Sequence, residues 1–373
     1  MDNYPYGRVS FPFRGRVTIA PAQRILNGTA MKGASPTGFT MATTLEIKDI
    51  LSDGQPSLDD LETAAALIYK SMPPTPQYRW PLLEARAGTT VWVKHENHTP
   101  VGGFKIRGGL VYMDALCRVG PKPDGVISAT RGNHGQSIGF AARQYGIPAA
   151  VVVPVGNSVE KNAAMRSLGV EVIERGYDFQ DACEIADEMA IARGWHRFPS
   201  FHPLLVRGVG TYALELFRAV PDLDTVYVPV GLGSGICGVI AARDALGLRT
   251  KIVAVVSNAA PAFALSYEQG RIASHDVTTR VADGMACRTP VEPALTVARN
   301  GAERVVLVSD NEIESAMRAL FEDTHNTAEG AGAAALAALL QEKEAMRGRN
   351  VAVVLSGGNV DSSLFATILQ NTD

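Results

Sequence analysis

The sequence has few of the features that mark several large classes of protein. Its 373 residues hold only four cysteines, Cys117, Cys183, Cys237 and Cys287, and no two of them form a Cys-x-x-Cys pair. Scattered cysteines in a chain of this size indicate free thiols in a reducing compartment and argue against a disulfide framework or a zinc site. No apolar run is long enough to cross a bilayer, and the N-terminus lacks the basic-then-apolar pattern of a secretory signal.

The chain also lacks a large excess of charge of either sign. The formal net charge is −3, and no basic block is interleaved with aromatic residues, so the electrostatic signature of a nucleic-acid-binding protein is missing. The remaining composition, 46% hydrophobic and 20% charged, is that of an ordinary globular chain, long enough for two lobes with sizeable cores. We therefore expect a cytoplasmic protein that has neither nucleic acid nor a membrane as a partner.

The N-terminal stretch differs from the rest of the chain. Residues 1–40 hold Gly, Pro, Arg and Ser with little periodicity, and Met41-Ala-Thr-Thr is a plausible beginning of the globular part. We interpret residues 1–40 as a flexible N-terminal arm, an oligomer contact or an extended gene start. A helix is then predicted from the capping Ser57 to about Lys70.

Beyond residue 124 the sequence alternates between short apolar runs and stretches with helical periodicity. The apolar runs, which we predict to be strands, are 125–129, 149–153, 170–173, 225–229, 251–256 and 350–355. The predicted helices are 134–145, 158–168, 179–193, 235–246, 312–321 and 329–343. Such alternation predicts an α/β fold of parallel or mostly parallel sheets covered by helices. We divide it into a small domain, 122–203, and a large domain, 41–121 with 204–373, and expect a ligand in the cleft between them.

One lysine, Lys105, is predicted to lie where a strand passes into a helix, at the edge of such a cleft. Lys105 follows a predicted strand, 90–94, and a Pro-Val-Gly-Gly turn, and the apolar spacing after Phe104 predicts a helix. The positive end of the helix dipole disfavours an ammonium, which helps a lysine act as a neutral nucleophile. A lone lysine at a helix start is more often simply solvated. The residues around Lys105 are therefore needed to choose between a nucleophile and a solvated side chain.

The neighbours of Lys105 form a motif. The segment reads Lys94-His-Glu96-Asn97-His-Thr-Pro100-Val-Gly102-Gly103-Phe104-Lys105-Ile-Arg107-Gly108. It resembles the Schiff-base lysine motif of fold-type II pyridoxal-phosphate enzymes, the tryptophan synthase β-like group that holds threonine and serine dehydratases, with Gly103 where serine is common. The resemblance runs from about Ser57 to the C-terminus through further motifs in the same order. It implies a two-lobed fold and pyridoxal 5′-phosphate as the cofactor.

The further motifs each follow a predicted strand or open a predicted helix. The loop that begins at Ser128 resembles the family's loop for the substrate α-carboxylate, and its amides suit an anion at a helix start. The loop 228–238 resembles the phosphate cup, where glycines let amides approach closely. The resemblance implies that Lys105 is catalytic and contacts the cofactor together with Phe104, Asn133, Gly231, Leu232, Gly233, Ser234, Gly235, Glu329 and Ser356. It assigns substrate binding to Ser128, Thr130, Arg131, Gly132 and His134.

Two positions depart from the family's pattern. Arg131 stands where many dehydratases have alanine and racemases have serine. It is expected to bind the substrate's α-carboxylate, to bind a side-chain carboxylate, to pair with a protein acid such as Glu96 or Glu329, or to point to solvent. Val256 matches the position of a glutamate in metal-binding members, and an apolar residue cannot ligate a hard cation, so we expect no metal.

The resemblance implies a lyase of amino-acid metabolism that forms a homodimer or homotetramer. Its reaction would be β-elimination from a small-molecule amino acid such as threonine or serine, giving a 2-oxo acid and ammonia. The alternatives are a substrate such as 3-hydroxyaspartate or another bulkier or acidic β-hydroxy amino acid, β-replacement, racemisation, and a binding protein without turnover. A nicotinamide-dependent oxidoreductase is disfavoured, because no acid follows the loop 233–238 at the spacing that ribose binding needs. Because the chain ends at the predicted catalytic lobe, we expect no isoleucine-type feedback control.

Overall fold

Two β-sheets organise residues 55–371, the part of the chain that the computed structural model describes. The six-stranded sheet has the order β1-β2-β10-β7-β8-β9, and the four-stranded sheet has the order β5-β4-β3-β6. All strand pairs within them are parallel except β1 with β2. The predicted α/β class with mostly parallel sheets is therefore confirmed, whereas the N-terminal arm predicted for residues 1–40 lies outside the described residues.

The strands are β1 (Gln77–Arg79), β2 (Thr90–His95), β3 (Val126–Ala129), β4 (Ala149–Val153), β5 (Val170–Glu174), β6 (His196–Arg197), β7 (Thr225–Pro229), β8 (Lys251–Ser257), β9 (Arg304–Val308) and β10 (Asn350–Leu355). The α-helices are α1 (Leu58–Ile68), α2 (Pro81–Ala87), α3 (Lys105–Arg118), α4 (Asn133–Tyr145), α5 (Val159–Ser167), α6 (Phe179–Arg193), α7 (Pro203–Ala219), α8 (Ser234–Ala245), α9 (Ala262–Gln269), α10 (Glu292–Gly301), α11 (Asp310–Thr324), α12 (Gly330–Gln341) and α13 (Ser362–Gln370). Two short 3-10 turns are η2 (Glu96–His98) and η3 (Asp283–Met285).

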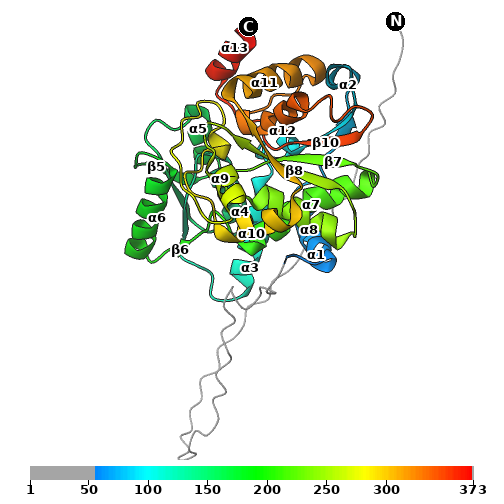
Figure 1. Ribbon diagram of the computed structural model, residues 1–373. Coiled ribbons are helices and arrows are strands. Elements are labelled where there is room, and N and C mark those ends of the chain that lie inside the picture. Colours follow the sequence, from blue (N-terminus) through cyan, green and yellow to red (C-terminus); the bar gives the residue numbers. More distant parts are fainter. Residues whose placement is uncertain (1–54, 372–373) are drawn as a thin grey trace, which may run out of the picture. The chain divides into compact units, whose positions relative to one another are not determined.

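Helices cover both faces of the six-stranded sheet, which explains why its strands are continuous apolar runs. In β8, Val253 and Val255 belong to the core under α11 and α12, whereas Ile252 and Ala254 belong to the core under α7 and α8. Figure 1 shows these two pairs of helices on opposite sides of the sheet. Because successive side chains of a strand point to opposite faces, a strand buried on both sides needs apolar residues at every position.

The four-stranded sheet repeats this arrangement. In β4, Val151 and Val153 belong to the core under α3 and α4, and Ala150 and Val152 belong to the core under α6. Strands β3 to β6 lie within residues 122–203, but the domain boundaries themselves stay a prediction. No helix between residues 55 and 371 is long and apolar enough to cross a membrane.

Helix α7 is the largest element that the sequence did not predict. Its interior glycines lower helix propensity and interrupt the apolar pattern. They are there for packing, because a Cβ on Gly208 would lie 2.4 Å from the carbonyl oxygen of Arg107 in α3. The two helices therefore pack with their backbones in close approach. The prediction also omits α2, α9, α10, α13, β1, β6 and β9.

Candidate active site

Segments that follow parallel strands of both sheets meet around one cavity. It has an empty volume of about 840 Å³, counting the space at its open mouth. The segment after β3 contributes 129–134, the loop after β7 contributes 229–235, and Ser356 follows β10 directly. Ligand sites in α/β proteins form at the carboxyl ends of parallel strands, so this is the expected place for one.

The cavity collects nearly all of the predicted site residues. Its lining includes Phe104, Lys105, Thr130, Arg131, Gly132, Asn133, His134, Gly231, Leu232, Gly233, Ser234, Gly235, Glu329 and Ser356. Ser128 is the exception. It lies in β3, and its hydroxyl donates a hydrogen bond to the carbonyl oxygen of Phe198 at 2.8 Å. It therefore supports the strand behind the cavity and does not line it.

Lys105 is the first residue of α3, and its amine faces the cavity. The only hydrogen bond of Nζ found within residues 55–371 goes to the Ser234 hydroxyl at 3.4 Å, which is longer than a normal N–H···O bond. Burial of the amine lowers the pKa of Lys105, and no carboxylate pairs with it among residues 55–371. A lysine of this kind is available as a neutral amine for nucleophilic or proton-transfer chemistry.

Two hydrogen bonds and one close packing contact fix the backbone around Lys105. The amide of Phe104 donates to the carbonyl of Ser356 at 3.1 Å, which ties the start of α3 to the end of β10. The hydroxyl of Ser137 in α4 donates to the carbonyl of Lys105 at 2.7 Å. In the preceding turn, Gly102 has φ +67, and a Cβ there would lie 2.7 Å from Asn359 Oδ1. The glycine is thus required by both the backbone conformation and the close packing.

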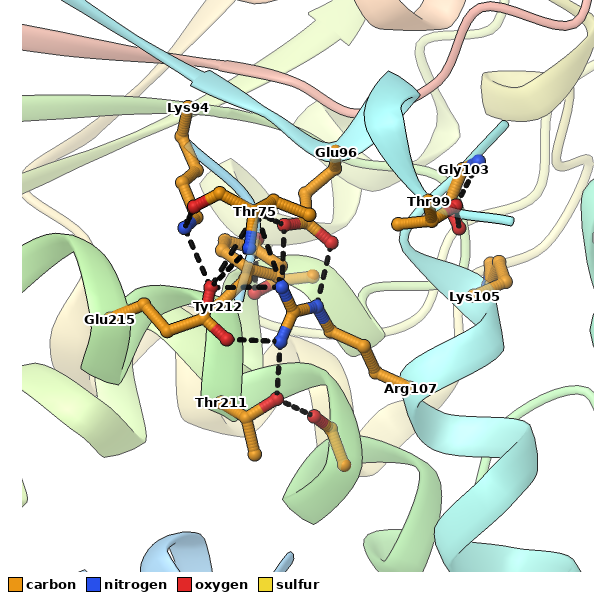
Figure 2. A network of polar contacts seen from close by, with 12 residues as sticks. Thr75, Lys94, Glu96, Thr99, Gly103, Lys105, Arg107, Thr211, Tyr212 and Glu215 are labelled. Atoms are coloured by element: carbon orange, nitrogen blue, oxygen red, sulfur yellow. Dashed lines mark hydrogen bonds and ion pairs between the residues drawn. The ribbon is translucent and has the colours of Figure 1, made fainter. Parts of the chain in front are cut away.

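A buried ion-pair network lies on the other side of α3 (Figure 2). The Arg107 guanidinium contacts both oxygens of Glu96, at 2.7 and 2.9 Å, and both oxygens of Glu215, at 2.6 and 2.9 Å. Lys94 donates to Glu215 at 2.7 Å. Lys94, Glu96 and Arg107 come from the recognised motif, but Glu215 comes from α7 and carries no sequence signal. The network attaches the first turn of α3, which presents Lys105, to β2 and α7.

The loop after β7 is built to receive an anion. None of the hydrogen bonds found within residues 55–371 uses the amides of Leu232, Gly233 or Ser234 as donors. These amides precede or open α8, whose N-terminal end carries the positive end of the helix dipole. Gly233 has φ +101, and a Cβ on Gly231 would lie 2.6 Å from the carbonyl oxygen of Gly284. Side chains at these positions would block the conformation that exposes the amides.

The loop after β3 forms a second set of free amides at the start of α4. The Thr130 hydroxyl oxygen accepts from the amides of Gly132 at 2.9 Å and Gly135 at 3.1 Å, which shapes the turn. The amides of Asn133 and His134 donate to no described residue. Burial, then the charge of Lys105, lowers the pKa of His134 to about 3. The neutral ring donates from Nε2 to the carbonyl of Pro199 at 3.0 Å, because a carbonyl only accepts.

Glu329 anchors a cluster that joins the two sheets at the cavity. Its Oε1 accepts from Asn133 Nδ2 at 2.6 Å, and its Oε2 lies 3.0 Å from Lys161 Nζ. Lys161 also donates to Asp283 at 2.7 Å. Burial by itself would lower the pKa of Lys161, but Glu329 and Asp283 outweigh it and raise that pKa, so the lysine stays charged. Its charge is therefore matched by two carboxylates of the protein.

Arg131 is a cation of the cavity without a partner among residues 55–371. It forms no ion pair there, and its Nε atom is buried without a hydrogen-bond acceptor. The protein acids considered for it, Glu96 and Glu329, are occupied by Arg107 and Lys161. The expected pairing of Arg131 with either acid is therefore absent in this part of the chain.

Sequence reasoning did not assign several further residues of the cavity, among them Lys161, Ser200 and Cys287. Lys161 lies in α5, where nothing in its local sequence distinguishes it from a solvated lysine. The Ser200 hydroxyl, in the link between β6 and α7, is buried without a hydrogen-bond partner among residues 55–371. Burial raises the pKa of Cys287 to about 11, so the thiol is protonated at neutral pH. The only sequence signal near Cys287 is the preceding segment Ala282-Asp283-Gly284, which resembles the family's Ala-Asp-Gly segment.

Comparison with known proteins agrees with this geometry. The family model described as "Pyridoxal-phosphate dependent enzyme" matches residues 68–357. The L-threonine ammonia-lyase of Geobacter sulfurreducens is 35% identical over 286 residues, which cover 76% of this chain and 71% of that protein. The processed threonine deaminase isoform 2 of Solanum lycopersicum has a TM-score of 0.75 and 27% identity, covering 85% of this chain and 95% of the other. Maize serine racemase has a TM-score of 0.78 and 28% identity, covering 84% and 97%.

A lysine-centred cavity between two mostly parallel sheets, with free amides on two sides, is the site of a fold-type II pyridoxal-phosphate enzyme. The chain belongs to the pyridoxal-phosphate-dependent enzyme family, among relatives that include threonine ammonia-lyases. The residues present fit that cofactor, because a weakly partnered lysine amine and an unused set of amides for a phosphate line the same cavity.

Proposed function

We propose that this protein converts a β-hydroxy amino acid such as threonine or serine to a 2-oxo acid and ammonia. The observation that carries the proposal is the Lys105 amine, which faces the cavity without a close partner, between two sets of free amides. The relatives named L-threonine ammonia-lyase and threonine deaminase support the same reaction. By the same resemblance we propose a cytoplasmic homodimer or homotetramer.

Each set of free amides receives one anion in this proposal. The amides of 232–234 would hold the phosphate of the cofactor, and Ser356, Asn133 and Glu329 would contact its ring. The amides of Asn133 and His134 hold the α-carboxylate of the substrate. Pyridoxal phosphate, when bound, supplies the electron sink that stabilises negative charge at Cα. The protein supplies position and electrostatics around it.

Lys105 then moves the proton. With the cofactor bound, its amine would take the proton from Cα, and its lowered pKa favours the neutral form that can accept a proton. The Cβ–O bond breaks, and the hydroxyl leaves with a proton as water. The released product takes up one water again and gives the 2-oxo acid and ammonia, so that no oxidant or reductant is needed.

A panel of amino acids, with ammonia and 2-oxo acid as readouts, tests the proposal. L-threonine or L-serine should release both products in equal amounts, and Lys105→Ala should release neither. A wild-type protein that holds the cofactor but releases no ammonia from any β-hydroxy amino acid would contradict the proposal.

Racemisation is a second candidate, favoured by the structural similarity to maize serine racemase. It needs a second acid/base group on the opposite face of Cα. The resemblance places that group at position 131, where this chain has an arginine, and a guanidinium offers hydrogen-bond donors but no acceptor. Incubation of L-serine followed by chiral chromatography should therefore yield pyruvate without D-serine.

A further inference from the structure

We propose that Arg131 and Ser200 form a subsite for a carboxylate on the substrate side chain, so that the preferred substrate is a β-hydroxy diacid of the 3-hydroxyaspartate class. This inference rests on the proposed function, because it names the substrate of the same site. It chooses between uses of Arg131 that the sequence left open.

The first argument is the missing partner of Arg131. The side chain lines the cavity, pairs with no acid among residues 55–371, and buries an unsatisfied Nε. A buried donor without an acceptor is costly, so a site that retains one is completed by its ligand. A guanidinium matches a carboxylate in geometry, since it can donate two parallel hydrogen bonds to it.

The second argument is that the two acids that line the cavity already pair with another cation. Lys161 contacts Asp283 and Glu329, at 2.7 and 3.0 Å. Asp178, the N-cap residue of α6, pairs with Arg288 at 2.9 Å. No carboxylate among residues 55–371 pairs with Arg131, and a carboxylate on the substrate would supply that partner.

The third argument is that the two anions of an ordinary amino-acid complex have donors elsewhere. The phosphate has the amides at the start of α8, and the α-carboxylate has the amides at the start of α4. Arg131 lines the same cavity as this second set of amides, so its guanidinium is left for a further anion. The remaining anion that a substrate can bring is a carboxylate on its side chain.

Ser200 supplies a second donor in the same cavity. Its hydroxyl is buried, has no hydrogen-bond partner among the described residues, and comes from the link that follows β6. The neighbouring Pro199 carbonyl is already used by His134. A carboxylate has acceptor sites for both a guanidinium and a hydroxyl, so Arg131 and Ser200 can both donate to the same carboxylate.

The chemistry of the diacid is the same elimination. Lys105 takes the Cα proton, the Cβ–O bond breaks, and the hydroxyl leaves as water. Uptake of one water by the released product gives a 2-oxo diacid and ammonia. The side-chain carboxylate takes no part in bond making, so the subsite determines specificity and not the reaction.

The test compares substrates within each variant. The ratio of kcat/KM for 3-hydroxyaspartate to that for L-threonine is measured for wild type, Arg131→Gln, Ser200→Ala and the control Arg143→Gln, which removes an exposed arginine at the far end of α4. Wild type should favour the diacid at least about tenfold, and Arg131→Gln should lower the ratio by about 10- to 100-fold, the range of a charged hydrogen bond. Ser200→Ala should lower it by about two- to tenfold, as a neutral hydrogen bond does, and Arg143→Gln should not change it.

Any one of three outcomes overturns the inference. Equal losses on threonine and the diacid in Arg131→Gln would place Arg131 at the α-carboxylate, and an unchanged ratio would remove it from substrate recognition. Calorimetric binding of L-aspartate and L-alanine tests the subsite without the reaction, because neither ligand has a β-hydroxyl to lose. A failure of the subsite can therefore be told apart from a failure of the proposed reaction. Wild type should bind aspartate at least about tenfold more tightly, and Arg131→Gln should lose that preference; equal binding of both by wild type refutes the subsite even if ammonia is released.

Discussion

Removing Arg107 tests how the active-site lysine is held in place. The Arg107 side chain is 0% exposed and bonds to two carboxylates, Glu96 and Glu215, through two contacts each. Lys94, also 0% exposed, completes the network by pairing with Glu215. Two cations therefore face two carboxylates, and the buried group as a whole carries no net charge.

The substitution Arg107→Met keeps the aliphatic stem of the side chain and deletes one of these charges. Two carboxylates then face Lys94 alone. Breaking a buried pair by removing one partner typically costs about 3–5 kcal/mol, because the remaining charge is neither solvated nor matched. We expect a loss of this size in the free energy of unfolding from urea denaturation. The visible spectrum of the bound cofactor should also change, since α3 carries Lys105 two residues earlier.

The control variant is Arg118→Met at the other end of the same helix. Arg118 pairs with Asp114 but is 68% exposed, so its loss should cost at most about 1 kcal/mol. The double variant Arg107→Met with Glu96→Gln leaves Lys94 opposite Glu215 and restores the charge balance. It should be more stable than the sum of the single losses predicts, by about 0.5–3 kcal/mol. A loss for Arg107→Met as small as that for Arg118→Met, or strict additivity in the double variant, would refute this reasoning.

Three shorter predictions concern the cofactor. Lys105→Ala should lack both turnover and the visible band that borohydride bleaches in wild type; an active, colourless wild-type protein would contradict this. Gly233→Val should retain the cofactor less tightly in dialysis, because its backbone has φ +101 and a Cβ would lie 2.6 Å from Ala294 Cβ, whereas Gly120→Val, with nothing within 4 Å, should behave as wild type. Activity should survive a chelator, since Val256 stands where a metal ligand is expected, and loss of activity that magnesium or calcium restores would show the assignment wrong.

The sequence by itself determined the motifs of this protein and most of the strands and helices that carry them. Apolar runs such as 149–153 predicted buried parallel strands, because a strand covered on both faces has no polar side. The apolar spacing after Phe104 predicted a helix that begins near that residue, and α3 begins at Lys105. These features are local, since turn residues, helix periodicity and motif spacing all act within a few residues of each other.

The tertiary structure decided which side chains meet. Glu215 joins Arg107 only because α7 packs closely on α3, and α7 was hidden by the glycines that this packing requires. Lys161 pairs with Glu329 across the two sheets, and Arg131 has no ion-pair partner within residues 55–371. Ser128 was assigned to the site from its motif, yet the direction of its side chain in β3 turns it away. Such pairings depend on packing between segments far apart in the chain, and no local pattern specifies them.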